Sequence, residues 1–146
     1  MDFRLYVSTL VSFGGKVLLV QEQKEKYHGK WNLPGGHLEI GETTLEGALR
    51  ELKEETGLVL DVQSTLGVYY NVHSDHTSFR FVYFGKSDID TVIAGDNIMD
   101  SKWFSPEEIE QMSDNEFVSA QQFREIIEDY KKGVTYPVKI FHSMKV

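Results

Sequence analysis

Two kinds of hydrophobic pattern, one typical of strands and one typical of a helix, constrain the fold more than any other feature of the sequence. Residues 5–13 and 16–21 are rich in β-branched and aromatic side chains and flank a Gly-Gly pair, which predicts two strands joined by a tight hairpin. From Thr44 to Thr56 apolar residues recur every three or four positions, which predicts an amphipathic helix. Thr43 or Thr44 is suited to cap its start, and Gly57 to end it. The chain must therefore form a sheet and pack this helix against it.

The rest of the chain continues the alternation of strands and helices. Strands are expected at about 58–71 and 77–86, with a short one at 102–104. Ser105-Pro106 is typical of a helix start, and a last helix is expected at about 119–132. This order predicts an α/β protein in which helices sandwich a mixed sheet. The length of 146 residues, without a repeat or a Pro/Ser-rich linker, predicts a single domain over residues 1–146.

Composition excludes several classes of protein. A formal net charge of −8 argues against a broad nucleic-acid surface, so no nucleic-acid polymer is expected as a partner. A local cation can still hold a small phosphate substrate. The absence of cysteine excludes disulfides, thiolate metal sites and a cysteine nucleophile, and it fits a reducing cytosol. No apolar run approaches the ~20 residues of a membrane span, and residues 1–4 lack the start of a signal peptide. We therefore expect a cytoplasmic protein with no membrane partner.

Three glutamates distinguish the predicted helix. Glu51, Glu54 and Glu55 share one flank of it, beside the apolar stripe. Like charges this close repel one another, and the end of the helix near them is the wrong pole for anions. Arg50 and Lys53 can pair with neighbouring carboxylates, whereas a hard divalent cation suits carboxylate oxygens better. Taken alone, the helix is equally compatible with a solvated acidic face.

The residues in front of the helix decide between these interpretations. Gly36 is followed after five residues by Glu42 and, after seven more, by residues 50–58, RELKEETGL. Residues 36–58 resemble the Nudix box, which is Gly, five residues, Glu, seven residues, Arg-Glu, an aliphatic, any residue, Glu-Glu, any residue, Gly and an aliphatic. Every fixed position matches, and a pattern this long is specific. The resemblance implies the Nudix fold, an α/β/α sandwich with a mixed β-sheet and a loop–helix–loop catalytic motif.

The resemblance also implies a metal site. Glu51 and Glu55 would be the principal ligands, and the backbone carbonyl of Gly36 would face the metal. Glu54 would be a further ligand or the group that orients the attacking water. The implied cofactor is Mg²⁺, with Mn²⁺ as a substitute, because both prefer oxygen ligands.

Arg50 and Glu42 would form a supporting pair that fixes the helix against the preceding loop. The implied reaction is hydrolysis of a phosphate anhydride in a nucleoside di- or triphosphate or a related diphosphate. Metal ions neutralise the anionic oxygens and acidify a bound water, whose proton a nearby carboxylate accepts. With no cysteine and no nucleophile motif, direct attack of water on phosphorus is favoured over a covalent intermediate. An additional loop carboxylate is either Asp96 or Asp100, and the sequence does not choose between them.

Residues outside the box point to the substrate. The loop at 36–39, GHLE, and the tail at 130–137, YKKGVTYP, resemble a bacterial Nudix phosphatase subgroup that acts on nucleoside tri- and diphosphates and on thiamine-type diphosphates. Arg80 is expected on the strand face opposite Phe79 and Phe81, where it either reaches a phosphate or base or forms a surface ion pair. The candidate substrate contacts are His37, Glu39, Arg80 and Tyr136, the last by stacking on a flat ring.

Two alternative functions stay open. One is an ADP-ribose or nucleotide-sugar pyrophosphatase with the same fold. The other is a non-catalytic Nudix-fold binding or regulatory domain, which would require the loss of box residues that are all present here. The expected partner is therefore a small-molecule nucleotide or diphosphate. The oligomeric state is left open, with a homodimer as the commonest alternative to a monomer.

Overall fold

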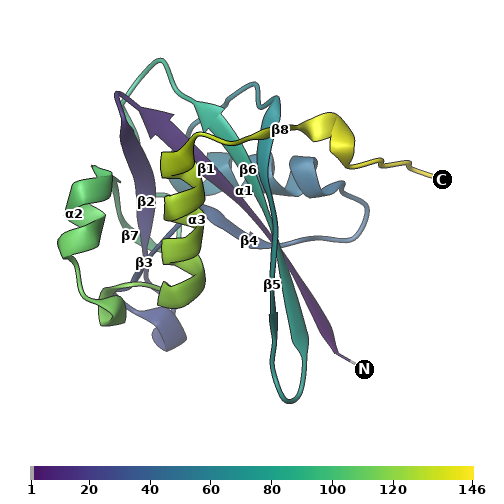
Figure 1. The fold of residues 1–146 in the computed structure, drawn as a ribbon, viewed down its shortest axis with the longest axis horizontal. Coiled ribbons are helices and arrows are strands. Elements are labelled where there is room, and N and C mark those ends of the chain that lie inside the picture. The colour runs from purple at the N-terminus through teal and green to yellow at the C-terminus, as the bar shows by residue number, and fades with distance from the viewer. Residues whose placement is uncertain (1) are drawn as a thin grey trace.

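An eight-stranded mixed sheet lies between helices on both of its faces (Figure 1). The structure is a computed structural model and describes residues 2–146. The strands are β1 (Phe3–Phe13), β2 (Lys16–Glu22), β3 (Trp31–Asn32), β4 (Gly35–His37), β5 (Ser64–Val72), β6 (Thr77–Lys86), β7 (Ile98–Phe104) and β8 (Tyr136–Pro137). The α-helices are α1 (Thr44–Thr56), α2 (Pro106–Gln111) and α3 (Ala120–Lys132), and the 3-10 helices are η1 (Glu25–Tyr27), η2 (Asp114–Glu116) and η3 (Val138–Ile140).

Strand order is β3-β2-β1-β6-β5-β8, with β4 paired to β1 and β7 paired to β2. β1 and β6 are parallel, whereas the other pairs are antiparallel, so the sheet is mixed as predicted. Ser12 opposes Val17 across the β1–β2 hairpin. Its turn residues Gly14 and Gly15 have φ values of 55° and 79°, a region that glycine adopts without steric cost. The predicted Gly-Gly hairpin is confirmed.

Each face of the sheet buries its own core. On the face covered by α1, Val7 packs with Ala48 and Tyr83. On the opposite face, Leu10 packs with Phe123 of α3. Because both faces are covered, successive residues of β1 are buried rather than every second one, which is typical of a central strand. The expected α/β/α sandwich is confirmed, and Figure 1 shows α1 and α3 on opposite sides of the sheet.

The helix α1 has the predicted bounds because its end signals are local. The Thr43 hydroxyl accepts a hydrogen bond from the Glu46 backbone N–H, and the Glu46 carboxylate accepts one from the Thr43 N–H. Gly57 ends the helix in the left-handed conformation, with φ 78°. On the apolar face Leu52 is fully buried, as expected. Leu45 and Leu49 are half-buried and pack against the same side of the sheet.

Two predicted strands have different bounds from those expected. β5 begins at Ser64 rather than near residue 58. Leu58 and Val62 are only 3% and 4% exposed because they pack in the α1-side core from an irregular segment, so their hydrophobicity does not indicate a strand. β7 begins at Ile98 rather than at 102; residues 98–101, IMDS, do not alternate apolar and polar side chains, so they gave no strand signal. Across residues 2–146 no helix combines the length and the hydropathy needed to cross a membrane.

Removal of the α1 cap tests how much the helix start depends on it. Thr43→Ala leaves one N-terminal N–H of α1 without its acceptor, so we expect the free energy of unfolding to fall by about 1 kcal/mol. Urea unfolding followed by circular dichroism measures this change. Thr91→Ala in an exposed loop is the matched control and should stay within about 0.5 kcal/mol of the parent. Equal effects of the two substitutions would contradict the role of the cap.

Candidate active site

Two consecutive glycines bring β4 against the helix α1. A Cβ on Gly35 would collide with the Val7 carbonyl of β1, and a Cβ on Gly36 would lie 2.5 Å from Oε1 of Glu51. Gly35 therefore requires the absence of a side chain, whereas a side chain at Gly36 would displace the Glu51 carboxylate. The Gly35 N–H donates to Oε1 of Glu55 at 2.8 Å. The backbone of β4 and the carboxylates of α1 thus form one site.

Arg50 joins the carboxylates of α1 to the loop in front of it. Its Nε and Nη2 donate to the two carboxylate oxygens of Glu42, both at 2.9 Å, in a bidentate pair. Nη1 donates to Glu51 at 3.0 Å and to Glu54 at 3.3 Å, and Nη2 also donates to the His37 carbonyl at 3.2 Å. The hydrogen bond from Arg50 holds the pKa of Glu42 below its ordinary value. The structure brings Arg50 and Glu42 together as the sequence led us to expect.

Glu55 lies in a buried cluster of negative charge. Burial raises its pKa to about 8, and the charges of Glu22 and Glu51 act in the same direction, against the hydrogen bond from Gly35. Glu22, at the end of β2, is 8% exposed, and burial raises its pKa as well. Sequence reasoning missed Glu22. It stands in the charged run at 21–26, which is typical of a solvated turn, so no local signal marks it as buried.

These residues fit a hard divalent cation. The donors are carboxylate and backbone oxygens, the ligands that such ions prefer, and a cation would offset the burial and the repulsion that together raise the pKa of Glu55. The expected set of Gly36, Glu51, Glu54 and Glu55 is only partly assembled, however. Glu54 is 58% exposed on the solvent side of Arg50. Within residues 2–146 no three acidic or histidine side chains converge in a ready-made metal geometry.

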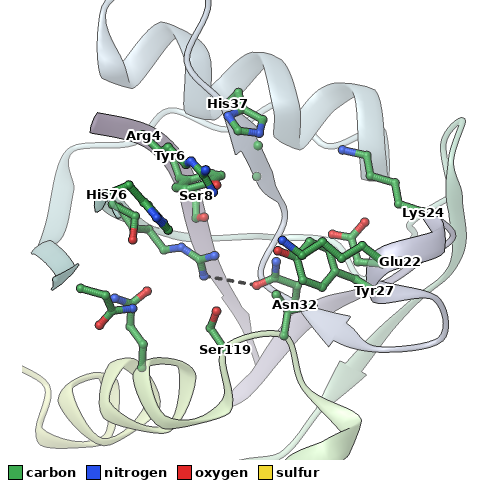
Figure 2. A pocket seen from close by; sticks show the side chains of 18 of the residues that line it. Arg4, Tyr6, Ser8, Glu22, Lys24, Tyr27, Asn32, His37, His76 and Ser119 are labelled. Atoms are coloured by element: carbon green, nitrogen blue, oxygen red, sulfur yellow. Dashed lines mark hydrogen bonds between the residues drawn. The ribbon is translucent and has the colours of Figure 1, made fainter. Parts of the chain in front are cut away.

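A cleft of about 600 Å³ opens beside Gly36, on the face of the sheet opposite α1. This volume is typical of small-molecule sites. The cleft is rich in cations although the chain is acidic, and two tyrosines offer flat rings. Figure 2 shows His37 and Tyr6 on one side of it, with Glu22 and Tyr27 on another. The cationic and aromatic residues that line it are Arg4, Tyr6, Lys24, Lys26, Tyr27, His37, His73, His76 and Arg80.

The four candidate substrate contacts divide into two pairs. His37 and Arg80 line the cleft. Glu39 does not, because its backbone N–H is tied to Glu42 and its carboxylate, 65% exposed, lies 3.6 Å from Arg50. Tyr136 is outside it too, since β8 pairs with the start of β5, whereas the cleft takes residues from the end of that strand.

Of the two carboxylates left open by the sequence, Asp96 lies in a loop, whereas Asp100 lies on β7 rather than in the expected loop; both are exposed and do not line the cleft. Several residues that do line it come from elements far apart in the sequence. Tyr6 lies on β1, Tyr27 on η1 and Asn32 on β3. Only the strand alternation of β1, which sets Tyr6 and Ser8 on one face, offered a local signal for any of them.

The chain belongs to the Nudix family, since the family model described as the NUDIX domain matches residues 3–126. It is accordingly a hydrolase of the divalent-metal-dependent Nudix class. Phosphatase NudJ of Escherichia coli is 35% identical over 139 residues, which cover 92% of this chain and 87% of the relative. An ADP-ribose pyrophosphatase of Methanocaldococcus jannaschii is 42% identical over 79 residues, 50% of this chain. The match spans 47%, about half, of the length of that protein. Among solved structures, a NUDIX hydrolase from Nitrosomonas europaea superimposes with a TM-score of 0.76 at 28% identity, covering 98% of each chain.

The carboxyl of Glu55 predicts a pH dependence for the metal-free protein. The folded state holds its proton up to a pKa of about 8, whereas the ordinary value is 4.5, so the folded state binds more protons between these values. The stability that this group contributes is therefore complete below pH 4.5 and is lost as the pH rises to about 8. The slope for one proton is about 1.4 kcal/mol per pH unit. Urea unfolding in EDTA from about pH 5 to about pH 9 measures it.

The control for this experiment is a pair of glutamine variants. Glu55→Gln keeps the shape of the side chain in its neutral form, so its unfolding free energy should lose most of the slope. Glu110→Gln, on the exposed face of α2, should keep the parent slope. Parallel curves for the parent and Glu55→Gln would show that Glu55 does not carry the extra proton.

Proposed function

We propose that this Nudix hydrolase uses Mg²⁺, with Mn²⁺ as a substitute, to release orthophosphate from a nucleoside di- or triphosphate or a related diphosphate. The observation that carries the proposal is the position of Gly35 and Gly36, which line the cationic cleft and contact the carboxylates of Glu55 and Glu51 respectively. A phosphate chain in the cleft would therefore reach the carboxylates. The match to Phosphatase NudJ supports the terminal cleavage, because it extends over 92% of the chain.

The carboxylates of α1 have separate roles in this proposal. Glu51 and Glu55, with the carbonyl of Gly36, hold the metal, and Glu54 orients the attacking water or serves as a further ligand. When bound, the metal neutralises phosphate oxygens and acidifies a water. Glu54 suits its role because its exposed carboxylate has only one 3.3 Å hydrogen bond to Arg50 to exchange. The Arg50–Glu42 pair keeps α1 in position while the other carboxylates rearrange.

The remaining residues of the cleft bind and orient the substrate. His37 lies beside Gly36 with its ring 4.6 Å from that of Tyr6, so the two rings support one another at the mouth of the site. Tyr27 offers a flat face for a base or a similar ring. We propose that the phosphate chain lies along Gly36 and His37 and that the ring of the substrate lies toward Tyr27. Direct attack of water is retained as the mechanism.

The setting of the enzyme is part of the proposal. Residues 1–146 are proposed to form one domain that works in the cytoplasm. The chain has no cysteine, so its fold contains no disulfide that a reducing compartment could break. A small nucleotide or diphosphate is the partner. A homodimer is the alternative to a monomer, and light scattering of the purified protein distinguishes the two.

An ADP-ribose pyrophosphatase is the second candidate. The supporting observation is the 42% identity to the protein of that name, but it extends over only 79 residues, half of this chain. The cleft has room for a nucleotide sugar, and its tyrosines suit an adenine ring as well as any other base. Analysis of the reaction products is therefore needed to distinguish the phosphatase from the ADP-ribose pyrophosphatase.

The metal ligands are tested by Glu55→Gln. The substitution removes a ligand charge and keeps the shape, so kcat should fall roughly 100-fold, the equivalent of a few kcal/mol of charge stabilisation. The unfolding midpoint in EDTA should not fall. The parent enzyme should lose its activity in EDTA and regain it with Mg²⁺ or Mn²⁺. Full turnover of the parent in metal-free buffer, or full activity of Glu55→Gln with Mg²⁺, would contradict the assignment of Glu55 as a metal ligand.

Product analysis tests the substrate class. A panel of nucleoside di- and triphosphates, a thiamine-type diphosphate and ADP-ribose is incubated with enzyme and Mg²⁺, and the products are separated by ion-exchange chromatography. We expect orthophosphate from the terminal position of the di- and triphosphates. Cleavage of ADP-ribose to AMP and ribose 5-phosphate, with the triphosphates untouched, would replace the phosphatase proposal by the pyrophosphatase alternative.

A further inference from the structure

Arg80 is a buried cation without an ion-pair partner among the described residues. It is 9% exposed, and its Nε has no hydrogen-bond partner within the described residues. The Nη1 group donates to Oδ1 of Asn32 at 3.3 Å, but the same oxygen already accepts from the Leu33 N–H at 2.9 Å. No ion pair among residues 2–146 includes Arg80. Burial lowers the pKa of its guanidinium, because the charged form loses its hydration and gains no ion pair in return.

The N-terminus of α3 opens into the same cleft. Ser119 and Gln122 line the cleft together with Arg80, and Figure 2 shows Ser119 at the start of this helix, near Asn32. The first N–H groups of a helix have no partner within it. In α3 they receive no side-chain cap from Ser119, and the first turn contains no acidic residue. The positive end of a 13-residue helix is thus left without an anion.

The start of α3 is fixed by contacts with β3 and is not a frayed helix end. The Val118 N–H donates to the Trp31 carbonyl at 3.0 Å, and Phe117 forms a parallel bridge with Trp31. Ser119 has φ 48°, a left-handed conformation that is uncommon for a residue with a side chain. Such backbone strain persists where the surroundings enforce it, and it is frequent at ligand sites.

We propose that the Arg80 guanidinium and the first turn of α3 form an oxyanion subsite that binds a phosphate group of the substrate. This inference deepens the proposed function, on which it rests for the identity of the ligand. A phosphate accepts several hydrogen bonds and carries the charge that Arg80 lacks, and helix N-termini and arginine are both suited to it. The subsite faces Gly36 across one cleft, so it binds a phosphate from the side away from the α1 carboxylates.

The test uses the metal-free protein in EDTA, with inorganic pyrophosphate and orthophosphate as probes in chloride buffer. Calorimetry measures the Kd, and a thermal scan measures the unfolding midpoint. Pyrophosphate should bind the parent and raise its midpoint. Arg80→Met should bind pyrophosphate at least tenfold more weakly, yet without ligand its midpoint should equal or exceed that of the parent. Replacing a buried charge without a partner by an apolar side chain of similar length removes a desolvation cost.

Arg124→Met is the matched control. Arg124 lies on α3 but does not line the cleft, and its three nitrogens donate to Asp114, Ile109 and Met112. Its substitution should lower the midpoint and leave the pyrophosphate affinity unchanged. Gln122→Glu is the second variant, since it keeps the shape and adds a negative charge to the first turn of α3. It should also weaken pyrophosphate binding at least tenfold.

The outcomes separate this subsite from the proposed hydrolysis. No binding by the parent, or pyrophosphate binding unchanged in both Arg80→Met and Gln122→Glu, overturns the subsite. Preference for pyrophosphate over orthophosphate assigns it to a phosphate within a chain, whereas equal binding assigns it to a terminal or released phosphate; both support it. Because no metal and no turnover are involved, binding without hydrolysis of any panel substrate would leave the subsite standing and reject the proposed function.

Discussion

The contact between β4 and α1 is the constraint on which the site depends. Gly35 presents bare backbone to β1 at a distance that no side chain would allow, and Gly36 leaves room for the Glu51 carboxylate in its present position. The Arg50–Glu42 fork then fastens the helix to the loop that follows β4. This arrangement keeps acidic side chains next to backbone groups in spite of their mutual repulsion. The rest of the sandwich, with apolar cores on both faces, gives the contact a rigid support.

The site also contains buried charges of opposite sign that form no direct ion pair with one another. Glu22, Glu55 and Arg80 are each less stable as an ion than in water, and Glu22 and Arg80 line the same cleft. Asn32 acts on both groups: its side chain opposes the rise in the pKa of Glu22, and its Oδ1 accepts a hydrogen bond from Arg80. The unliganded protein thus holds unmatched charges that would be paired directly in a molecule built for stability alone. Unmatched buried charges of both signs in one site are expected where a cation and an anion bind together.

The features that could be predicted from the sequence are those with local causes. The bounds of α1 follow from Thr43 and Gly57, and the box residues fall together because they are spaced along one loop and helix. The sequence could not predict that Glu22, Asn32 and the start of α3 meet in one cleft. Their meeting depends on strand order and on the pairing of Trp31 with Phe117. A different long-range pairing, of β8 with the start of β5, places Tyr136 at the end of the sheet away from the cleft.

The distribution of charge also resolves an apparent conflict between composition and substrate. A chain with a net charge of −8 repels anions over most of its surface, yet its cleft gathers Arg4, Lys24, Lys26 and Arg80. In a low-dielectric cleft the field of a few cations is concentrated, whereas the acidic charges elsewhere are screened by salt over about 10 Å. A small phosphate compound is therefore attracted to one place on the molecule, and a long polyanion meets repulsion beyond the cleft. The net charge therefore argues against a polymeric partner, whereas the local arrangement of cations suits a small anion.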